Sequence, residues 1–472
     1  MKKTKIIGTI GPSCIDDEIL ESMILEGMDV ARVNLSHSDY DFAEKVVNKI
    51  RKLNKKLNKT VGILFDTKGP EIRVGKFLND EITLNNGDKV ILTPSKADGT
   101  NNKINISYKG LSLDLDIDDV ILLDEGNIEL CVTGIKNTDI TCKVIRGGVL
   151  KNNKSLNVPG VELSIDFLSN TDKNDILFAS KLDVDFISLS FVRTANDILD
   201  VNDLLISERN EHLQIITKIE NKSAIEDLEN IIKVSDGIMV ARGDLGVEIP
   251  IEKLPCIQKK IIKETRKRNK ICIVSTEMLS SMESKIRPTR AEVSDVSNSV
   301  IDGVDAVMLS GETAVGMYPL DAVKMMANII KETEESLDYH AFLQEKYTEK
   351  TNDETAALAF AAVDVANMLK AKAIVVSTMS GLTAKKVSIY RPYSPIIVTT
   401  PRYDVAVSLS LNFGVYSAVT FECNSTDEII SNAKDVVNKC MEYDEDDRII
   451  ITGSIPIKSV RGTNFIKIEN VK

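Results

Sequence analysis

The segment between Gln214 and Pro250 carries the residues best suited to chemistry, because charged side chains directly follow two short apolar runs there. Lys218 and Glu220 end the first run, which contains IIT. Arg242 and Asp244 follow the second run, which contains IMV. Apolar runs of this length, rich in Ile and Val, predict buried strands. The charges must then lie at the mouths of these strands, since they cannot lie in the core.

Glu220 and Asp244 are separated by about one strand–helix–strand repeat, so neighbouring parallel strands would bring the two carboxylates together. Two carboxylates with Lys218 between them are what a divalent cation and a phosphoryl group require. The segment therefore predicts a cation site that supports phosphoryl chemistry. The alternative is an ordinary salt bridge between strands, with no chemical role.

The elements that would position these residues recur along the chain. Eight short apolar runs occur at residues 5–10, 30–35, 61–66, 185–191, 214–219, 237–242, 271–276 and 305–310. Helical segments with Glu and Lys lie between most of them, and apart from one gap the spacing is about 23 to 34 residues, which is typical of strand–helix units. Eight such units predict a closed (β/α)8 TIM barrel more readily than an open sheet.

The active site of such a barrel lies at the carboxyl ends of its strands. In this chain those ends carry polar residues, namely Asn34, Asp66, Ser190, Lys218, Glu220, Asp244, Thr276 and Glu312. Their coincidence at the predicted mouth is the strongest physical argument for an active site in the barrel.

The barrel domain is expected to comprise residues 1–69 and 166–340. The remaining segments have different patterns of apolar and polar residues. Residues 70–165 alternate apolar and polar side chains between turn signals, which predicts a small inserted β-barrel domain that acts as a lid over the mouth. Residues 352–472 alternate helices and apolar runs, typical of an open α/β sheet domain. Residues 339–353 lack a strong period and are predicted to be a linker.

Composition narrows the partners and the compartment. The 472 residues suit about three domains. The net charge of −12 argues against nucleic acid or an anionic membrane as the main partner. The apolar run of the N-terminal MKKTKIIGTIGPS is too short for a signal peptide, and no run is long enough to span a membrane. Seven scattered cysteines without a C-x-x-C pattern indicate reduced residues of a cytoplasmic protein.

Several longer motifs are specific enough to indicate a family. They include TKIIGTIGPS, GMDVARVNLSHSD, LFDTKGPEIRVG, KSLNVPG, DFISLSFVR, TKIEN, DGIMVARGDLGVEIP, STEML and RPTRAEVSDVSNSVIDGVDAVMLSGETAVGMYPL, followed by SGLTA and YRPYSPI. In content and order these motifs resemble the pyruvate kinase family over essentially the whole chain. The chain ends at Lys472 just after the last predicted strand, so it is expected to lack the extra C-terminal domain of some bacterial members.

The resemblance implies the last step of glycolysis, in which phosphoenolpyruvate transfers its phosphoryl group to ADP and gives ATP and an enolate that is protonated to pyruvate. Catalysis of this type is mostly positioning and charge stabilisation. By resemblance, Glu220 and Asp244 hold Mg²⁺ (or Mn²⁺) and Lys218 stabilises the charge on the phosphoryl group and the enolate. Arg32 and Arg73 clamp phosphate oxygens.

The resemblance also implies the substrate contacts. Thr276 belongs to the route that delivers a proton to the enolate carbon, with a water chain behind it, because a threonine alone is a poor acid. Backbone N–H groups at Gly243 and Asp244 bind the substrate carboxylate. Ser190 supports the substrate site without taking part in the chemistry.

A monovalent cation and the nucleotide complete the implied active site. Asn34, Ser36, Asp66 and the carbonyl of Thr67 match the family's K⁺ site. Glu71 stands where K⁺-dependent members carry glutamate, so K⁺ dependence is expected. The residues expected to contact ADP or ATP between barrel and lid are Arg32, Asn34, His37, Arg73 and, after lid closure, Lys154. The alternatives are a surface histidine at His37 and a solvated turn at Lys154.

The C-terminal domain is expected to bind an effector, either a sugar phosphate or a nucleotide, and the enzyme is expected to be an allosteric homotetramer. The effector residues implied by the resemblance are Ser377, Thr378, Ser380, Gly381, Thr383, Arg461 and Gly462. Such hydroxyl clusters are otherwise helix caps. Arg290 resembles a subunit-interface residue.

One departure and two rival functions remain. Glu277 stands where the family usually has glutamine, which adds a negative charge near the barrel mouth. An enolate aldolase on a related barrel would also use a metal held by Glu and Asp, but it would need no lid over ADP and no Lys154. A catalytically inactive sensor of sugar phosphates is disfavoured because the chemical residues are all present.

Overall fold

A closed barrel of eight parallel strands forms the centre of the computed structural model, which describes residues 1–94, 98–100, 102–210, 212–347, 352–456 and 462–471. The strands are β1 (Lys5–Thr9), β2 (Val30–Asn34), β3 (Gly62–Asp66), β13 (Phe186–Leu189), β14 (Gln214–Ile219), β15 (Gly237–Ala241), β16 (Ile271–Ser275) and β17 (Ala306–Leu309). They follow one another around the barrel in sequence order, and β17 pairs with β1. The predicted TIM barrel is confirmed.

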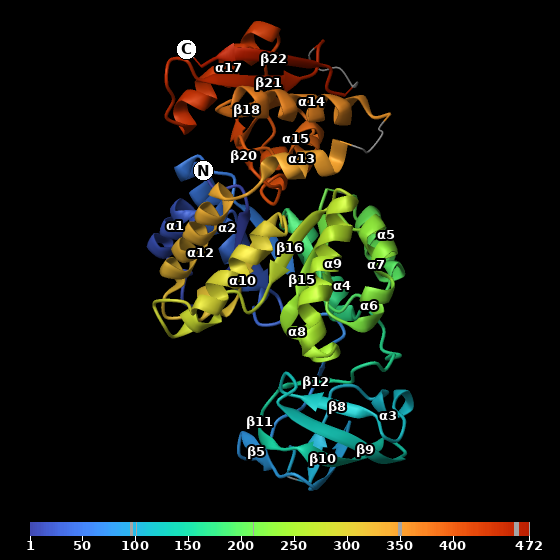
Figure 1. Ribbon diagram of the computed structural model, residues 1–472. Helices are drawn as coiled ribbons and strands as arrows, with labels where there is room; N and C mark the ends of the chain where they lie inside the picture. Colours follow the sequence, from blue (N-terminus) through green and yellow to red (C-terminus); the bar gives the residue numbers. More distant parts are fainter. Residues whose placement is uncertain (95–97, 101, 211, 348–351, 457–461, 472) are drawn as a thin grey trace.

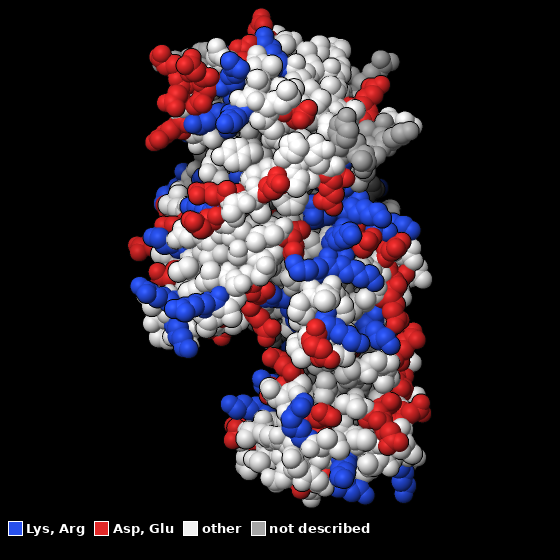
Figure 2. Space-filling view, in the orientation of Figure 1, with Lys and Arg blue, Asp and Glu red and all other residues white. Residues whose placement is uncertain are grey.

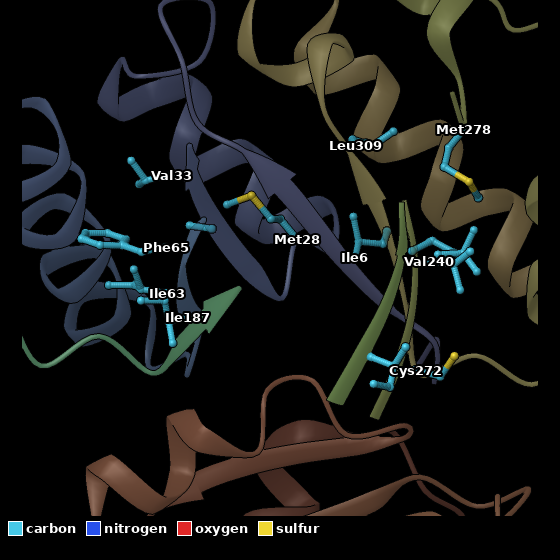
Figure 3. Close-up of a cluster of buried hydrophobic side chains, with 14 of the residues drawn as sticks. Ile6, Met28, Val33, Ile63, Phe65, Ile187, Val240, Cys272, Met278 and Leu309 are labelled. Atoms are coloured by element: carbon cyan, nitrogen blue, oxygen red, sulfur yellow. The ribbon is translucent and has the colours of Figure 1, made fainter. Parts of the chain in front are cut away.

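Helices surround the barrel and supply its outer core. They are α1 (Asp17–Glu26), α2 (Tyr40–Leu57), α4 (Asn170–Lys181), α5 (Ala195–Ser207), α6 (Lys222–Glu226), α7 (Leu228–Val234), α8 (Arg242–Glu248), α9 (Leu254–Lys267), α10 (Arg290–Ile301), α11 (Gly311–Ala314) and α12 (Pro319–Glu335), with short 3-10 helices η1 (Ile251–Lys253) and η2 (Ser280–Glu283). Capping boxes begin α4 at Ser169 and α10 at Thr289, where each side chain satisfies backbone donors. Figure 3 shows part of the apolar layer between strands and helices, including Phe65 and Val240.

A β-rich unit is inserted between β3 and α4 and lies beyond the carboxyl ends of the barrel strands (Figure 1). It contains β4 (Ile72–Arg73), β5 (Glu81–Leu84), β6 (Lys89–Thr93), β7 (Lys103–Asn105), α3 (Leu111–Asp114), β8 (Val120–Leu123), β9 (Ile128–Lys136), β10 (Asp139–Arg146), β11 (Gly148–Lys151) and β12 (Ser155–Asn157). One seven-stranded sheet and the pair β11–β5 enclose a separate apolar core.

Gly69 lies where the chain leaves the barrel for this unit. Its φ of +67° is a left-handed conformation, and a Cβ there would stand 2.5 Å from the carbonyl oxygen of Ser190. Its N–H donates to Asp172, 2.9 Å away, in the first turn of α4. Glycine is therefore required at this close approach.

The C-terminal unit packs against the opposite end of the barrel (Figure 1). Its five-stranded sheet has the order β20 (Val415–Val419), β19 (Ile396–Thr400), β18 (Ala373–Ser377), β21 (Arg448–Gly453), β22 (Phe465–Asn470), and only β22 is antiparallel to its neighbour. The flanking helices are α14 (Glu354–Leu369), α15 (Leu382–Ile389), α16 (Tyr403–Ser408) and α17 (Thr426–Cys440). Leu411 of this unit joins the core inside the barrel. The predicted open α/β sheet is confirmed.

The predicted linker is only partly irregular, because α13 (Tyr339–Tyr347) occupies its first part. Tyr339 and Leu343, four residues apart, are both buried, and Leu343 packs into the core of the C-terminal unit. These two buried side chains lie on the same face of α13 and hold the helix by tertiary packing. Two apolar residues are too few to give a helical periodicity that would predict α13 from the sequence. None of the helices among the described residues is both long and apolar enough to cross a membrane.

Candidate active site

Arg32 and Asp66 form the inner wall of the site, at the ends of β2 and β3. The Arg32 guanidinium pairs with Asp66 Oδ2 and donates to Thr9 Oγ1 at 2.9 Å. Asp66 Oδ1 accepts a hydrogen bond from Ser188 at 2.7 Å. Burial would raise the pKa of Asp66, but Lys218 and Arg32 outweigh it and lower that pKa to about 2. Asp66 is therefore an anion that fixes both cations.

Lys218 is the central cation, projecting from β14. Its Nζ lies 2.8 Å from Glu220 Oε1 and 3.6 Å from Asp66 Oδ2, and donates to Ser190 Oγ at 2.9 Å. Burial alone would lower the pKa of Lys218, yet Asp66 and Glu220 raise it above its usual value. The ammonium is thus buried, permanently charged and held in one position.

Glu220 lies beside this cation, and Asp244 is near enough for its charge to act on both Lys218 and Glu220. Glu220 is fully buried; its Oε2 accepts from the backbone N–H of Phe191 at 2.6 Å, whereas its Oε1 accepts no well-aligned hydrogen bond. Burial raises the pKa of Glu220 to about 8, and Asp244 adds to this while Lys218 opposes it. A buried carboxylate oxygen without an aligned donor, close to a second carboxylate, fits a cation ligand.

These two carboxylates are a small ligand set. Over the described ranges no group of three or more His, Cys, Asp and Glu side chains is arranged to hold a metal ion. A cation at Glu220 and Asp244 would therefore complete its shell with substrate and water oxygens, which is the coordination that Mg²⁺ prefers.

Thr276 follows β16 in a strained backbone. Its φ is +64° and that of Glu277 is +54°, which is rare for residues with a Cβ and rarer for a β-branched one. The Arg242 guanidinium holds the Thr276 carbonyl oxygen through Nη2 at 2.6 Å and Nε at 3.2 Å. The Thr276 hydroxyl accepts from the Gly243 N–H at 2.8 Å and donates to the Ser275 carbonyl. This clamp places Thr276 beside the first turn of α8, which carries Asp244.

A cleft of about 1100 Å³ separates the barrel mouth from the inserted unit, and its lining includes Ser36, His37, Glu71, Arg73, Lys154 and Asp244. Arg73 pairs with Glu71 at 2.7 Å, and Lys154 pairs with Asp124 at 2.7 Å. Burial, then the charge of Arg73, lowers the pKa of His37, which favours its neutral form. The structure brings these residues together around one open space.

The four residues expected to hold K⁺ are also neighbours. Asn34 and Asp66 pair directly across β2 and β3. Asn34 Oδ1 accepts from the Ser36 N–H at 3.0 Å, and the Thr67 carbonyl accepts from Ser190 Oγ at 2.7 Å. All four offer oxygen atoms, the ligand type that hard cations take.

The sequence of the whole chain is similar to those of known proteins. Residues 1–323 match a family model described as pyruvate kinase, barrel domain, and residues 356–469 match one described as pyruvate kinase, alpha/beta domain. A pyruvate kinase of Clostridium perfringens is 43% identical over 476 residues, covering 100% of both chains. The chain belongs to the pyruvate kinase family. Pyruvate kinases of Staphylococcus haemolyticus and Sporosarcina psychrophila are each 42% identical, with 100% and 99% of this chain aligned to 81% and 80% of theirs.

Membership of the pyruvate kinase family defines the reaction as transfer of the phosphoryl group of phosphoenolpyruvate to ADP. The resemblance drawn from the motifs is thereby confirmed, as is the assignment to the glycolytic phosphotransferases. Neither the aldolase nor the inactive sensor is favoured by any feature of the site.

The expected effector loop of this pyruvate kinase joins β18 to α15. The Thr378 hydroxyl accepts from the Gly381 N–H at 3.0 Å, and Gly381 itself has a φ of +80°. A cavity of about 320 Å³ adjoins the loop; its lining includes Ser377, Thr378, Ser380, Thr383 and Gly462 but, among the described residues, no Lys or Arg. Arg461, the expected basic residue, lies outside the described residues.

Three residues of the pyruvate kinase site, Ser188, Thr9 and Asp295, escaped the sequence analysis, and a fourth, Arg242, was noted there without a role. Ser188 precedes Ser190 by two positions on the same face of its strand, so the alternation of β13 could have signalled it. Thr9, at the end of β1, holds Arg32. Arg242 and its partner Asp295, 2.5 Å apart, hold Thr276, but their sequence separation left no local signal.

Proposed function

We propose that this pyruvate kinase performs phosphoryl transfer at the barrel mouth with Lys218 as the principal charge-stabilising residue. The observation that carries this proposal is the position of its Nζ, 2.8 Å from Glu220 Oε1 and 2.9 Å from Ser190 Oγ. A fixed cation in a water-poor site stabilises charge in the transition state without reorganisation. Lys218 would face the transferred phosphoryl group and then the enolate oxygen.

Glu220 and Asp244 would hold Mg²⁺, or Mn²⁺ in its place. The Oε1 atom of Glu220 supports this role because it is buried without an aligned hydrogen-bond donor. When bound, the ion supplies positive charge to the carboxylate and phosphate oxygens of phosphoenolpyruvate. Members of the family generally depend on Mg²⁺ and K⁺, so Asn34, Ser36, Asp66 and Thr67 would hold K⁺.

Arg32 and Arg73 would orient phosphate oxygens from opposite sides of the cleft, since guanidinium groups pair with them bidentately. Backbone N–H groups at Gly243 and Asp244 would bind the carboxylate of phosphoenolpyruvate. Thr276 would position a water that protonates the enolate carbon, because its own hydroxyl proton is already donated to Ser275. Ser190 would hold Lys218 in place.

The nucleotide would occupy the cleft between the barrel and the inserted unit. Arg32, Asn34 and His37 would contact ADP from the barrel, and Arg73 would contact it from the inserted unit. Lys154, which neighbours Arg73 in that unit, would join them after the unit closes as a lid. Lys154 pairs with Asp124, which also belongs to the inserted unit. Lys154 can therefore exchange that carboxylate for a phosphate of ADP without leaving its own side of the cleft.

Regulation would take place in the C-terminal unit. A phosphorylated metabolite, either a sugar phosphate or a nucleotide, would bind the loop of Ser377, Thr378, Ser380, Gly381 and Thr383. Arg461 and Gly462, which precede β22 in the sequence, would complete the site. The loop supports this role because it opens onto a cavity of about 320 Å³.

The enzyme would act as a homotetramer. Arg290 begins α10, and the exposed apolar side chain Ile286 lies four residues before it. Met317, also apolar and exposed, is brought near by the hydrogen bond from its N–H to the Glu283 carbonyl at 2.8 Å. Apolar groups gathered near one helix support a subunit contact there. Sedimentation analysis of the full chain would give the mass of a tetramer, whereas a monomer would contradict the assignment.

The decisive experiment measures pyruvate formation from phosphoenolpyruvate and ADP with Mg²⁺, with and without K⁺, across a panel of sugar phosphates and AMP. Turnover should require K⁺ and rise with one effector. Unchanged activity when tetramethylammonium replaces K⁺ would contradict the monovalent site. Lys218→Met should lower turnover more than tenfold, whereas Lys233→Met, at an exposed position of α7, should not; a smaller loss at Lys218 would overturn its role.

A further inference from the structure

A separate cavity of about 160 Å³ lies at the base of the barrel, where the C-terminal unit packs against the beginnings of the strands. We call it the basal cavity. Its lining includes five cationic residues, Arg266, Lys270, Lys346, Lys385 and Arg391, against two carboxylates, Asp236 and Asp305. Figure 2 shows Lys and Arg side chains gathered over the end of α9 that meets the C-terminal unit. The surplus is positive in a chain whose net charge is −12.

Some of these cations have carboxylate partners. Arg391 pairs with Asp305 at 3.0 Å, and Arg266 pairs with Glu345 at 2.8 Å. Lys270 and Lys385 differ, because within the described part of the chain neither has a carboxylate within the 4.0 Å of an ion pair. Lys270 donates to the Ser235 carbonyl at 2.7 Å, and Lys385 to Gln214 Oε1 at 2.9 Å. Each ammonium therefore has neutral acceptors only.

Two further features of the basal cavity suit a negatively charged ligand. Burial lowers the pKa of Lys385, because its ammonium group is removed from water without a carboxylate close enough to compensate for the lost hydration. Asn412, 7% exposed, also lines the cavity, and its side-chain oxygen accepts no hydrogen bond. Because an amide can rotate to exchange its oxygen and nitrogen, this position can equally offer N–H donors to an anion.

We propose that the basal cavity binds a small polyvalent oxyanion of the phosphate class. Two lysine ammonium groups and an amide converge on a space that would hold about five waters at about 30 Å³ each. An ion the size of inorganic phosphate fits that space. Charge-assisted hydrogen bonds from Lys270 and Lys385 would supply the affinity.

The place of the cavity gives the bound anion a structural role. Gln214 begins β14 and Ile271 begins β16, the strands that lead to Lys218 and Thr276. Lys385 lies on α15, whose first turn follows Gly381 of the candidate effector loop. An anion here would therefore join the C-terminal unit to the base of the catalytic strands and stabilise their junction.

Isothermal titration of the full chain with inorganic phosphate, at constant ionic strength and without Mg²⁺, tests the site. Saturable binding should weaken at least tenfold in Lys385→Gln and in Lys270→Gln, and Lys385→Arg should retain it within about threefold. The matched control is Lys386→Gln, one residue along the same helix and paired with Asp353 at 3.0 Å, which should bind as the parent does. Phosphate should also raise the Tm of the parent but not of Lys385→Gln.

Equal binding by the parent and by both glutamine variants would overturn the proposal, since phosphate would then occupy the active site or the effector loop instead. The Tm of each variant without phosphate shows whether it is folded, and the second lysine keeps the test decisive if one variant is not. The titration needs no turnover, so its outcome is independent of the roles proposed for the catalytic residues.

Discussion

Removal of the Arg242 guanidinium should impair catalysis although Arg242 need not touch the substrate. The side chain fixes the carbonyl oxygen of Thr276 through two donors, at 2.6 and 3.2 Å. Thr276 and Glu277 both have positive φ, a conformation that costs about 1–3 kcal/mol per residue and persists only where surrounding contacts enforce it. In Arg242→Met the enforcing contact is lost, and we expect the Thr276 backbone to relax away from α8.

The magnitude follows from the lost interaction. A hydrogen bond from a charged group contributes about 1.5–3 kcal/mol. Since about 1.36 kcal/mol corresponds to a tenfold change in rate, kcat should fall by about 10- to 150-fold. The KM for phosphoenolpyruvate should change by less than about threefold, because the contacts of Lys218 remain. Arg242→Lys, which keeps one donor, should lie between the parent and Arg242→Met.

Steady-state kinetics of pyruvate formation would measure both constants, with thermal unfolding as the check on the fold. Asp295, the partner of Arg242, has a side chain that is 34% exposed, so its charge stays partly solvated when the arginine is removed. Arg268→Met is the matched control, since Arg268 pairs with Glu229 and Glu264 on the barrel exterior. A kcat of Arg242→Met within threefold of the parent, in folded protein, would refute the clamp.

Three further results are expected. Gly69→Ala should lower the free energy of unfolding in urea by about 1–3 kcal/mol, because its φ is +67°; an unchanged value would contradict the required close approach. Burial, opposed by Asp29, lowers the pKa of Lys5 from 10.5 to about 8, so between these pH values the unfolded chain binds more protons than the folded one. The parent should therefore gain stability relative to Lys5→Met as pH rises from 8 to 10.5. A pH-independent difference in the free energy of unfolding would contradict this. Lys154→Gln should raise the KM for ADP by about 3- to 30-fold at little cost in kcat, whereas Lys151→Gln in the same unit should not; equal effects would remove Lys154 from the nucleotide site.

The barrel could be predicted from the sequence because each strand is an apolar run with polar residues at or just after its carboxyl end. β14 and β15 show this most clearly, since Lys218 and Glu220 mark the end of one and Arg242 and Asp244 follow the other. The alternation in β9 and β10 likewise identified the inserted unit as a β domain. Apolar runs and apolar–polar alternation determine which faces of a strand are buried, so strands of this kind can be predicted from the sequence without knowledge of tertiary contacts.

The contacts that hold the site in place could not be predicted in the same way. Arg242 and Asp295 are 53 residues apart, and only the folded barrel brings them together. The left-handed backbone at Thr276 runs against the preference of a β-branched residue, so propensity predicts the wrong conformation there. Helix α13 was missed for a related reason, since its stability comes from packing rather than from its own pattern.

The insertion between β3 and β13 also bears on the order in which the chain folds. These strands pair directly in the barrel, yet the hydrogen bond from Ser188 to Asp66 spans 122 residues of sequence. Closing a disordered loop of that length costs about 1.6 kcal/mol more than closing one of about 20 residues. The inserted unit has its own apolar core, and its two ends enter and leave at the barrel mouth. If this unit folds first it shortens the effective loop, so barrel closure is fastest when β4–β12 are already assembled.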